Sequence, residues 1–257
     1  MYPNLFGIEG FSMTFMIIIG VIAAATLVFV YLYKKGVPSD SFLDLGIVIV
    51  VTVLVGIIFA ILVENIYEAI KHAVNHNPQS WTWAMTFYGG LIGGIPTFLL
   101  MYRYYYLKNN PSIMDKLIVI APAGITLGHA FGRIGCFLSG CCYGIETDLD
   151  KGVLFPGHEH PVVPTQLIES IFLFVLTAVL VIFAIKYSTI YNFVIYFSFY
   201  GVFRFIIEFF RGDERGQLAG LSPSQYWCII LLLGSIPLYI FLKKKYGYLK
   251  EDKDDEI

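Results

Sequence analysis

Seven long apolar runs dominate this sequence and leave few folds open to it. They cover residues 11–33, 45–63, 85–102, 117–131, 165–185, 190–210 and 225–242. Most approach the ~20 apolar residues that a helix needs to cross the core of a bilayer, whereas 117–131 is shorter and is expected to end in a broken helix. Because 57% of the residues are hydrophobic and only 14% are charged, a soluble globular domain is excluded. The sequence predicts an all-α membrane protein with seven transmembrane helices, forming a single domain over residues 1–257.

The positions of the cations predict the orientation, since Lys and Arg accumulate in cytoplasmic loops. If all seven runs span, 11 of the 17 cations share one side: Lys34, Lys35, Arg103, Lys108, Lys116, Lys186, Lys243, Lys244, Lys245, Lys250 and Lys253. The opposite side receives Lys71, Arg133, Lys151, Arg211 and Arg215. We therefore expect an extracytoplasmic N-terminus and a cytoplasmic C-terminus.

The most distinctive stretch is residues 132–144, GRIGCFLSGCCYG. Arginine is always charged, and its planar fork of donors matches phosphate oxygens. Glycines let backbone N–H groups approach the same anion closely. We expect Arg133, with Gly132, Gly135 and Gly144, to lie on a glycine-rich turn where a membrane helix reaches water, and to bind a lipid phosphate.

A second group of charges lies inside the run 190–210 and just beyond it. Arg204, Glu208 and Arg211 are spaced i, i+4 and i+7, which places them on one helical face. Ionisable residues within membrane spans are costly and often mark functional sites. Either Arg204 and Glu208 only neutralise each other, or the three residues line a polar cavity for an anionic headgroup. Glu169, near the start of another run, is interpreted as favouring a positive helix N-terminus.

Pairs of glycines at i and i+4 spacing occur in two of the runs: Gly89, Gly90, Gly93 and Gly94, and Gly124, Gly128 and Gly132. Such patterns are typical of close helix packing in lipid. The alternative is that Tyr88, Gly89 and Gly90 present a phenol and backbone donors to a headgroup.

Three of the four cysteines are grouped as Cys136, Cys141 and Cys142, while Cys228 is interpreted as a small apolar residue. Cys136 can form a disulfide with one of the other two, which an oxidising outer face favours and which we expect. A thiolate beside an arginine is a second interpretation. The third is a zinc site that adds one of three histidines, His129, His158 or His160. All three stay open at this point.

Five stretches, taken in order, resemble the prolipoprotein diacylglyceryl transferases over about residues 10–240: 85–93, 132–144, 160–169, 200–211 and 221–225. The resemblance implies seven membrane helices in the bacterial plasma membrane and an active site facing the extracytoplasmic side. It implies transfer of the diacylglyceryl group of phosphatidylglycerol to a lipobox cysteine of a prelipoprotein, with release of glycerol phosphate. The implied partners are these two substrates and membrane lipid, with no nucleic acid and no cofactor.

The resemblance also assigns roles residue by residue. It implies four catalytic residues, Tyr88, Arg133, Arg204 and Glu208, and a set of substrate-binding residues, Gly89, Gly90, Gly132, Gly135, Cys136, Ser139, Cys141, Gly144 and Arg211. The chain departs from the family pattern at Tyr88, which replaces a histidine, at Cys136 and Ser139, which replace asparagines, and at Cys141, which replaces a glutamate. No tyrosine matches the family's early-helix tyrosine, where Met13 or Thr14 falls.

Thiol alkylation requires a leaving phosphate whose charge is stabilised and an acceptor thiol that loses its proton. The arginines satisfy the first requirement, and Tyr88 or Glu208 is the candidate base for the second. Two other functions stay open. One is a related phospholipid-dependent transferase with a different acceptor, and the other is a non-catalytic lipid-binding or thiol module on the same fold.

Overall fold

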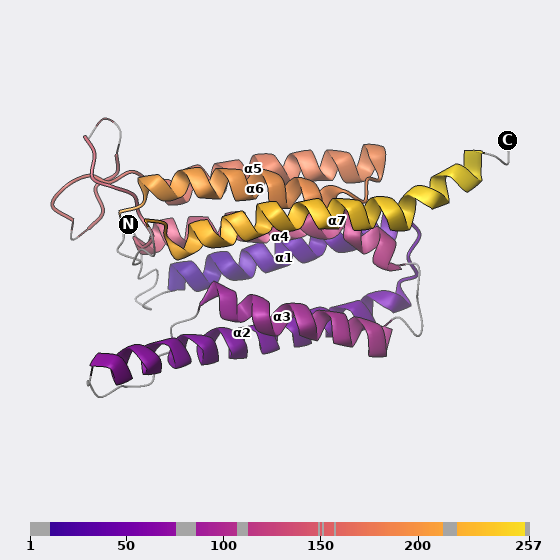
Figure 1. Cartoon of the computed structure of the whole chain (residues 1–257), viewed down its shortest axis with the longest axis horizontal. Coiled ribbons are helices and arrows are strands. Elements are labelled where there is room, and N and C mark those ends of the chain that lie inside the picture. Colours follow the sequence, from indigo (N-terminus) through magenta and orange to yellow (C-terminus); the bar gives the residue numbers. More distant parts are fainter. Residues whose placement is uncertain are drawn as a thin grey trace. The chain divides into compact units, whose positions relative to one another are not determined.

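The computed structural model describes residues 11–75, 86–106, 113–148, 150, 152–156, 158–212 and 220–254. The regular structure of these residues is helical, with isolated β-bridges in place of strands (Figure 1). The elements are α1 (Phe11–Lys34), α2 (Asp40–Asn75), α3 (Phe87–Met101), the π-helix η2 (Tyr102–Tyr106), α4 (Ile113–Ser139), α5 (Thr165–Ile182), the π-helix η3 (Phe183–Tyr187), α6 (Asn192–Ile207), the 3-10 helix η4 (Glu208–Phe210) and α7 (Pro223–Asp254). The predicted all-α class is confirmed.

Six segments of the described residues are long and apolar enough to cross a bilayer: Ser12–Lys34, Asp40–Ile70, Ile113–Ser139, Thr165–Tyr187, Asn192–Phe210 and Pro223–Lys245. The chain is therefore a multi-pass membrane protein. The predicted run 85–102 forms α3, which has 15 residues and is continued by η2. A seventh span and the orientation of the termini stay predictions.

Helix α4 is longer than its apolar run indicated. It has 27 residues and continues through Arg133 and Cys136 to Ser139, so the predictions of a broken helix and of an arginine on a turn were wrong. Pro and Gly are tolerated within membrane helices because neighbouring helices and polar side chains satisfy the freed backbone groups. The helix ends at Gly140, whose φ of +70° is accessible because glycine has no Cβ.

The chain divides into two compact units, Met1–Leu32 with Asp115–Ile257, and Tyr33–Met114. In the second unit, α3 packs closely on α2. A Cβ on Gly89 would lie 2.6 Å from the Phe59 carbonyl oxygen, and one on Gly90 would lie 3.8 Å from the Gly56 carbonyl oxygen. The packing interpretation of these glycines is confirmed, most strongly at Gly89.

In the first unit, small residues bring α1 and α4 together. A Cβ on Gly20 would lie 2.9 Å from the Gly128 carbonyl oxygen, and one on Gly135 would lie 3.2 Å from Met13 Cα. A methyl on Gly132, by contrast, would meet nothing within 4 Å among the residues described. Gly128 and Gly135 are therefore packing residues, whereas Gly132 has no such contact in the described part of the chain.

Buried hydroxyl groups join α4 to α5. Ser170 Oγ donates to the Ala130 carbonyl at 3.0 Å, and Thr177 Oγ1 donates to Thr126 Oγ1 at 2.8 Å. Interhelical hydrogen bonds of this kind fix helix rotation in lipid, where apolar contact alone does not. The polar edge of α5 is thus turned toward α4.

Aromatic and serine contacts continue the bundle to α6 and α7. Phe172 of α5 stacks on Phe203 of α6 with ring centroids 3.9 Å apart, and Ser198 of α6 lies 3.4 Å from Ser235 of α7. Within this unit, the C-terminal ends of α4 and α6 and the N-terminal ends of α5 and α7 lie at the same end (Figure 1).

The loop after α4 is tied to that end by backbone hydrogen bonds. Gly144 N donates to the Val163 carbonyl at 2.8 Å, and Ile145 N donates to the Phe210 carbonyl at 2.9 Å. A Cβ on Gly144 would lie 2.6 Å from the same Phe210 oxygen, so only glycine allows this approach. The loop is thereby held against the end of α6, beside Arg211, with which Gly144 forms an isolated bridge.

Candidate functional site

The centre of the site is a carboxylate, Glu169, in the first turns of α5. It is 2% exposed, and its Oε2 lies 3.0 Å from Arg133 Nε and 3.9 Å from Arg204 Nη1. The Tyr200 hydroxyl donates to its Oε1 at 2.9 Å. Glu169 therefore joins α4, α5 and α6, a role well beyond that of a charge at a helix start.

Arg204 and Glu208 pair with each other as their i, i+4 spacing predicts. The distance from Arg204 Nη2 to Glu208 Oε2 is 2.7 Å. The other oxygen of Glu208, Oε1, accepts a hydrogen bond of 2.8 Å from Ser222 Oγ. Both oxygens are engaged, and Glu208 holds Arg204 in place.

The residues 221–225 supply the last side of the site. Ser222, at the start of α7, bonds Glu208 and accepts a hydrogen bond from the Gln225 backbone at 3.3 Å. Ser224 Oγ lies 3.5 Å from Arg204 Nη2. This explains why a serine-rich helix start follows the charged stripe in the sequence.

We refer to five residues together as the arginine cluster: Arg133, Glu169, Tyr200, Arg204 and Glu208. Its two guanidinium groups balance its two carboxylates, and Arg211 beside them adds a positive charge. Arg133 is 8% exposed, and its Nη2 has no hydrogen-bond partner among the residues described. Because buried donors are rarely left unsatisfied, this nitrogen is a position for an anionic oxygen.

Besides Glu169, two side chains at the cluster were not predicted as site residues: Tyr200, and His129 except as a possible zinc ligand. His129 Nε2 lies 3.7 Å from Glu169 Oε1, and its ring packs edge-to-face on Tyr200 with centroids 5.4 Å apart. His129 lies four positions before Arg133, and Tyr200 lies four positions before Arg204. Each therefore shares the helical face of a predicted arginine. That spacing was the signal in the sequence.

The remaining predicted positions separate into two groups. The Ser139 hydroxyl, at the end of α4, is buried and has no hydrogen-bond partner within the described part of the chain. Tyr88, Gly89 and Gly90 belong to α3 in the other unit, and the Tyr88 side chain lies outside the described part of the structure. Their roles toward a substrate stay predictions.

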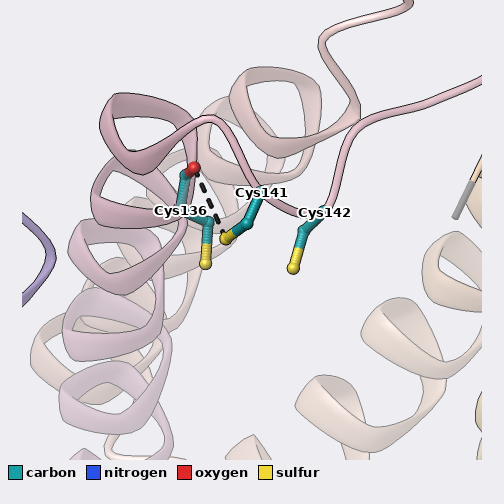
Figure 2. A group of neighbouring side chains, drawn as sticks. All are labelled: Cys136, Cys141 and Cys142. Carbon is teal, nitrogen blue, oxygen red and sulfur yellow. Dashed lines mark hydrogen bonds between the residues drawn. The ribbon is translucent and has the colours of Figure 1, made fainter. Parts of the chain in front are cut away.

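The three cysteines converge where α4 ends. Their Sγ atoms all lie within 4.8 Å of one another, and Figure 2 shows the side chains of Cys136, Cys141 and Cys142 directed to the same side of the turn. All three are free cysteines, so the expected disulfide is not formed in this structure. We call this group the three-thiol cluster.

The histidines proposed as zinc ligands do not join the three-thiol cluster. His129 contacts Glu169, and His158 packs on Tyr143 with ring centroids 4.4 Å apart. No histidine of the described residues shares the space of the three sulfurs, and His160 is exposed in the loop. A zinc site of mixed cysteine and histidine ligands was therefore a wrong interpretation.

The two cysteines beyond α4 differ in acidity. Hydrogen bonds with the thiols of Cys136 and Cys141 hold the pKa of Cys142 well below its ordinary value, and the guanidinium groups of Arg211 and Arg133 lower it further. Hydrogen bonds with Cys136 and Cys142 raise the pKa of Cys141. Of the two, Cys142 is the one whose surroundings favour the thiolate.

Comparison with known proteins gives consistent matches over nearly the whole chain. The family model described as prolipoprotein diacylglyceryl transferase matches residues 4–241. The phosphatidylglycerol–prolipoprotein diacylglyceryl transferase 2 of Clostridium perfringens is 33% identical over 249 residues, which cover 94% of this chain and 94% of that protein. The transferase of Clostridium tetani is 34% identical over 249 residues, covering 93% and 94%, and that of Dehalococcoides mccartyi strain 195 is 31% identical over 239 residues, covering 90% and 88%.

Proposed function

Because the chain belongs to the prolipoprotein diacylglyceryl transferase family, we propose that its arginine cluster binds the phosphate of phosphatidylglycerol during transfer to a prelipoprotein cysteine. The chain is a transferase of lipoprotein biosynthesis. The observation that carries the assignment of the site is the convergence of Arg133 and Arg204 on Glu169.

Glu169 makes the phosphate site possible by holding two like charges together. Guanidinium groups brought side by side in a buried region repel each other, and a shared carboxylate offsets this repulsion. The contacts with Glu169 and Glu208 occupy only some of the N–H donors of the Arg133 and Arg204 guanidinium groups. The donors that are left, among them Nη2 of Arg133, are available to the oxygens of a phosphate.

The reaction joins the acceptor sulfur to C3 of the glycerol that carries the two acyl chains. The bond from this carbon to the phosphate oxygen breaks, and glycerol phosphate leaves with the electron pair. Negative charge therefore develops on the leaving oxygen, where fixed cationic donors stabilise the transition state more than the ground state. Arg133, Arg204 and Arg211 are the groups that supply this stabilisation.

The acceptor thiol must also lose its proton. The contacts of Glu208 with Arg204 and Ser222 weigh against Glu208 as the base. Tyr88, in α3, remains the candidate drawn from the sequence. His129 is a second one, because its ring lies beside Glu169 at the phosphate site.

We further propose that α3 with η2 is a seventh span and that the cluster faces the extracytoplasmic side of a bacterial plasma membrane. The charges of the first unit support this orientation. By sequence, Lys116 begins α4 while Arg133 is near its end, Lys186 follows α5 while Glu169 is near its start, and the lysines at 243–245 are far from the start of α7. Figure 1 shows the end of α4 and the starts of α5 and α7 at the same end of this unit. Under the positive-inside rule, the lysine end is cytoplasmic.

Complementation tests the function. The chain is expressed in a bacterial strain depleted of its own transferase, and a reporter prelipoprotein is analysed by mass spectrometry. We expect the mass of the reporter to increase by one diacylglyceryl group. If the chain is inserted in the membrane and consumes phosphatidylglycerol while the reporter stays unmodified, the acceptor is a different one.

A further inference from the structure

We propose that the three-thiol cluster binds one soft divalent metal ion, with zinc as the best fit, and leaves its fourth coordination position to the acceptor cysteine. The first part depends only on Cys136, Cys141 and Cys142. The second part rests on the proposed function, since it identifies the incoming ligand with the thiol that this function alkylates. The departures of the chain from its family's pattern at positions 136 and 141 then have a chemical purpose.

The distances suit a single tetrahedral ion. The three Sγ atoms lie within 4.8 Å of one another. Zinc–sulfur bonds of about 2.3 Å in tetrahedral geometry place the sulfurs about 3.8 Å apart. Small rotations of the cysteine side chains are therefore enough to bring the three sulfurs to one ion.

The backbone holds the cluster in position before any ion binds. Cys142 has a φ of +66°, a left-handed conformation that a residue with a Cβ adopts only when its surroundings impose it. The start of α5 imposes it here. Thr165 Oγ1 donates to the Cys142 carbonyl at 3.1 Å, and Gln166 Nε2 donates to the Cys141 carbonyl at 2.6 Å.

The surroundings also suit the charge of a metal–thiolate group. Three thiolates and one divalent cation carry a net charge of −1. Arg133 interacts electrostatically with Cys136 and Cys142, and Arg211 interacts with Cys142. These guanidinium groups stabilise the anionic complex, and they place it beside the proposed phosphate site.

The fourth coordination position of the ion is where the site would take part in the reaction. Within the described chain, no further His, Cys, Asp or Glu shares the space of the three sulfurs. Zinc in proteins takes four ligands, and a site with three protein ligands keeps one position for water or substrate. A cysteine thiol is the soft ligand that such an ion prefers, and the proposed acceptor presents one.

The acceptor thiol binds the ion and releases its proton to water, which makes a metal-bound thiolate. This sulfur forms a bond to glycerol C3, while the C–O bond to the phosphate breaks and the phosphate oxygen keeps the electron pair. The thioether product is a weaker ligand than a thiolate and leaves the ion, which is neither oxidised nor reduced.

Metal analysis of the purified chain tests the binding site. The protein is prepared without oxygen, incubated with zinc, passed through a desalting column and analysed by mass spectrometry of the element. We expect about one zinc ion per chain. Cys136→Ser, Cys141→Ser and Cys142→Ser should each bind at least ten times less, whereas Cys228→Ser, which changes a buried cysteine of α7, should keep the full amount. A wild-type chain without zinc overturns the proposal, as does a native disulfide in protein kept free of oxygen.

Cobalt spectroscopy tests the coordination without relying on variants that fail to fold. Cobalt bound to wild-type protein should give sulfur-to-cobalt charge-transfer bands and intense visible bands of a tetrahedral site. A lipobox peptide should increase the charge-transfer absorbance, because a fourth sulfur joins the ion. The same peptide with serine in place of cysteine should leave the spectrum unchanged, and an equal response to both peptides overturns the open position.

The two proposals fail separately. A chain that modifies prelipoproteins at full rate after complete removal of metal refutes the coordination of the acceptor thiol by the ion and leaves the proposed function intact. A chain that binds one zinc ion but transfers no diacylglyceryl group refutes the proposed function and leaves the ion site standing.

Discussion

At the scale of single residues, Glu169 is the one on which the geometry of the site depends. It contacts both Arg133 and Arg204 and accepts the Tyr200 hydroxyl. Exchanging a whole buried ion pair for apolar residues is often nearly neutral, whereas removing one partner leaves an uncompensated charge. The most informative change is therefore the one that removes the carboxylate alone.

We expect Glu169→Gln to lower the free energy of unfolding by about 3–5 kcal/mol, because two buried guanidinium groups lose their common counterion. Thermal unfolding in detergent measures the effect. Glu159→Gln changes an exposed glutamate of the loop after α4 and serves as the matched control, with an expected change within about 0.5 kcal/mol. Equal stabilities for the two variants would contradict the role given to Glu169.

The acidity of Cys142 gives a prediction that depends on pH. Its pKa is lowered, so the thiolate persists as the pH falls through the range in which an ordinary cysteine, with a pKa of about 8.5, becomes protonated. In metal-free, reduced protein, alkylation of Cys142 by iodoacetamide should change less than about threefold between pH 8 and pH 6. A cysteine in a short peptide should slow about tenfold per unit over the lower part of that range. Peptide mass spectrometry measures the rate at each site, and a tenfold decrease per unit at Cys142 would refute the prediction.

The arginines of the site could be predicted from the sequence, whereas their neighbours Glu169, His129 and Tyr200 could not. Arg133, Arg204 and Glu208 were recognisable because charges within or beside apolar runs are costly and need a reason. Glu169 has an ordinary explanation at a helix start, and His129 and Tyr200 are compatible with any packed helix. Only the packing of α4, α5 and α6 brings these side chains together.

At the scale of elements, α4 carries two glycines of the signature with different surroundings. Gly135 packs against α1, with the position of a Cβ 3.2 Å from both Met13 Cα and Met16 Cβ. Gly132 lies one turn earlier and meets nothing within 4 Å among the described residues. A sequence pattern cannot distinguish them, because both fit the small-residue spacing of packed helices.

We expect Gly135→Ala to destabilise the protein by about 1–3 kcal/mol, since the added methyl group has to displace α1. Gly132→Ala should leave the stability within about 0.5 kcal/mol of wild type and reduce transfer, because Gly132 is one of the predicted substrate-binding residues. Thermal unfolding and the transfer rate, measured on both variants, separate the two effects. A stable Gly135→Ala beside an unstable Gly132→Ala would reverse the assignment.

Helix ends were harder to predict than helices. Apolar length alone identified α1, α3, α5 and α6 to within a few residues. It missed the first five and the last twelve residues of α2, the last twelve of α7, and the eight residues of α4 from Gly132 to Ser139. Polar and glycine residues end helices in water, but in a bilayer the backbone must stay hydrogen-bonded. The end therefore comes only at Gly140, where the chain reaches a left-handed conformation.

At the scale of the whole molecule, the apolar composition predicted a helical membrane protein, and the family comparison agrees over residues 4–241. The number of spans depends on α3, whose 15 residues are short for a bilayer core. The orientation depends on the lysines, which the positive-inside rule places on the cytoplasmic side.

Labelling with a thiol reagent that cannot cross membranes tests the orientation. After treatment with reductant and a zinc chelator, Cys141 or Cys142 should react in intact cells, because the end of α4 is proposed to face outward. A cysteine introduced by Lys244→Cys should react only after lysis. Reaction of the native cysteines only after lysis would invert the topology.

The central claim is that the guanidinium group of Arg133 binds the phosphate of the lipid donor. The turnover of Arg133→Lys, measured by mass shift of a lipobox peptide with phosphatidylglycerol, tests it most directly, because lysine keeps the charge and loses the bidentate fork. We expect a loss of about 2–4 kcal/mol of transition-state stabilisation, which is about 30- to 1000-fold in rate, while Arg103→Lys, at an exposed arginine, stays at the wild-type rate. Undiminished turnover in a folded Arg133→Lys protein would contradict the claim.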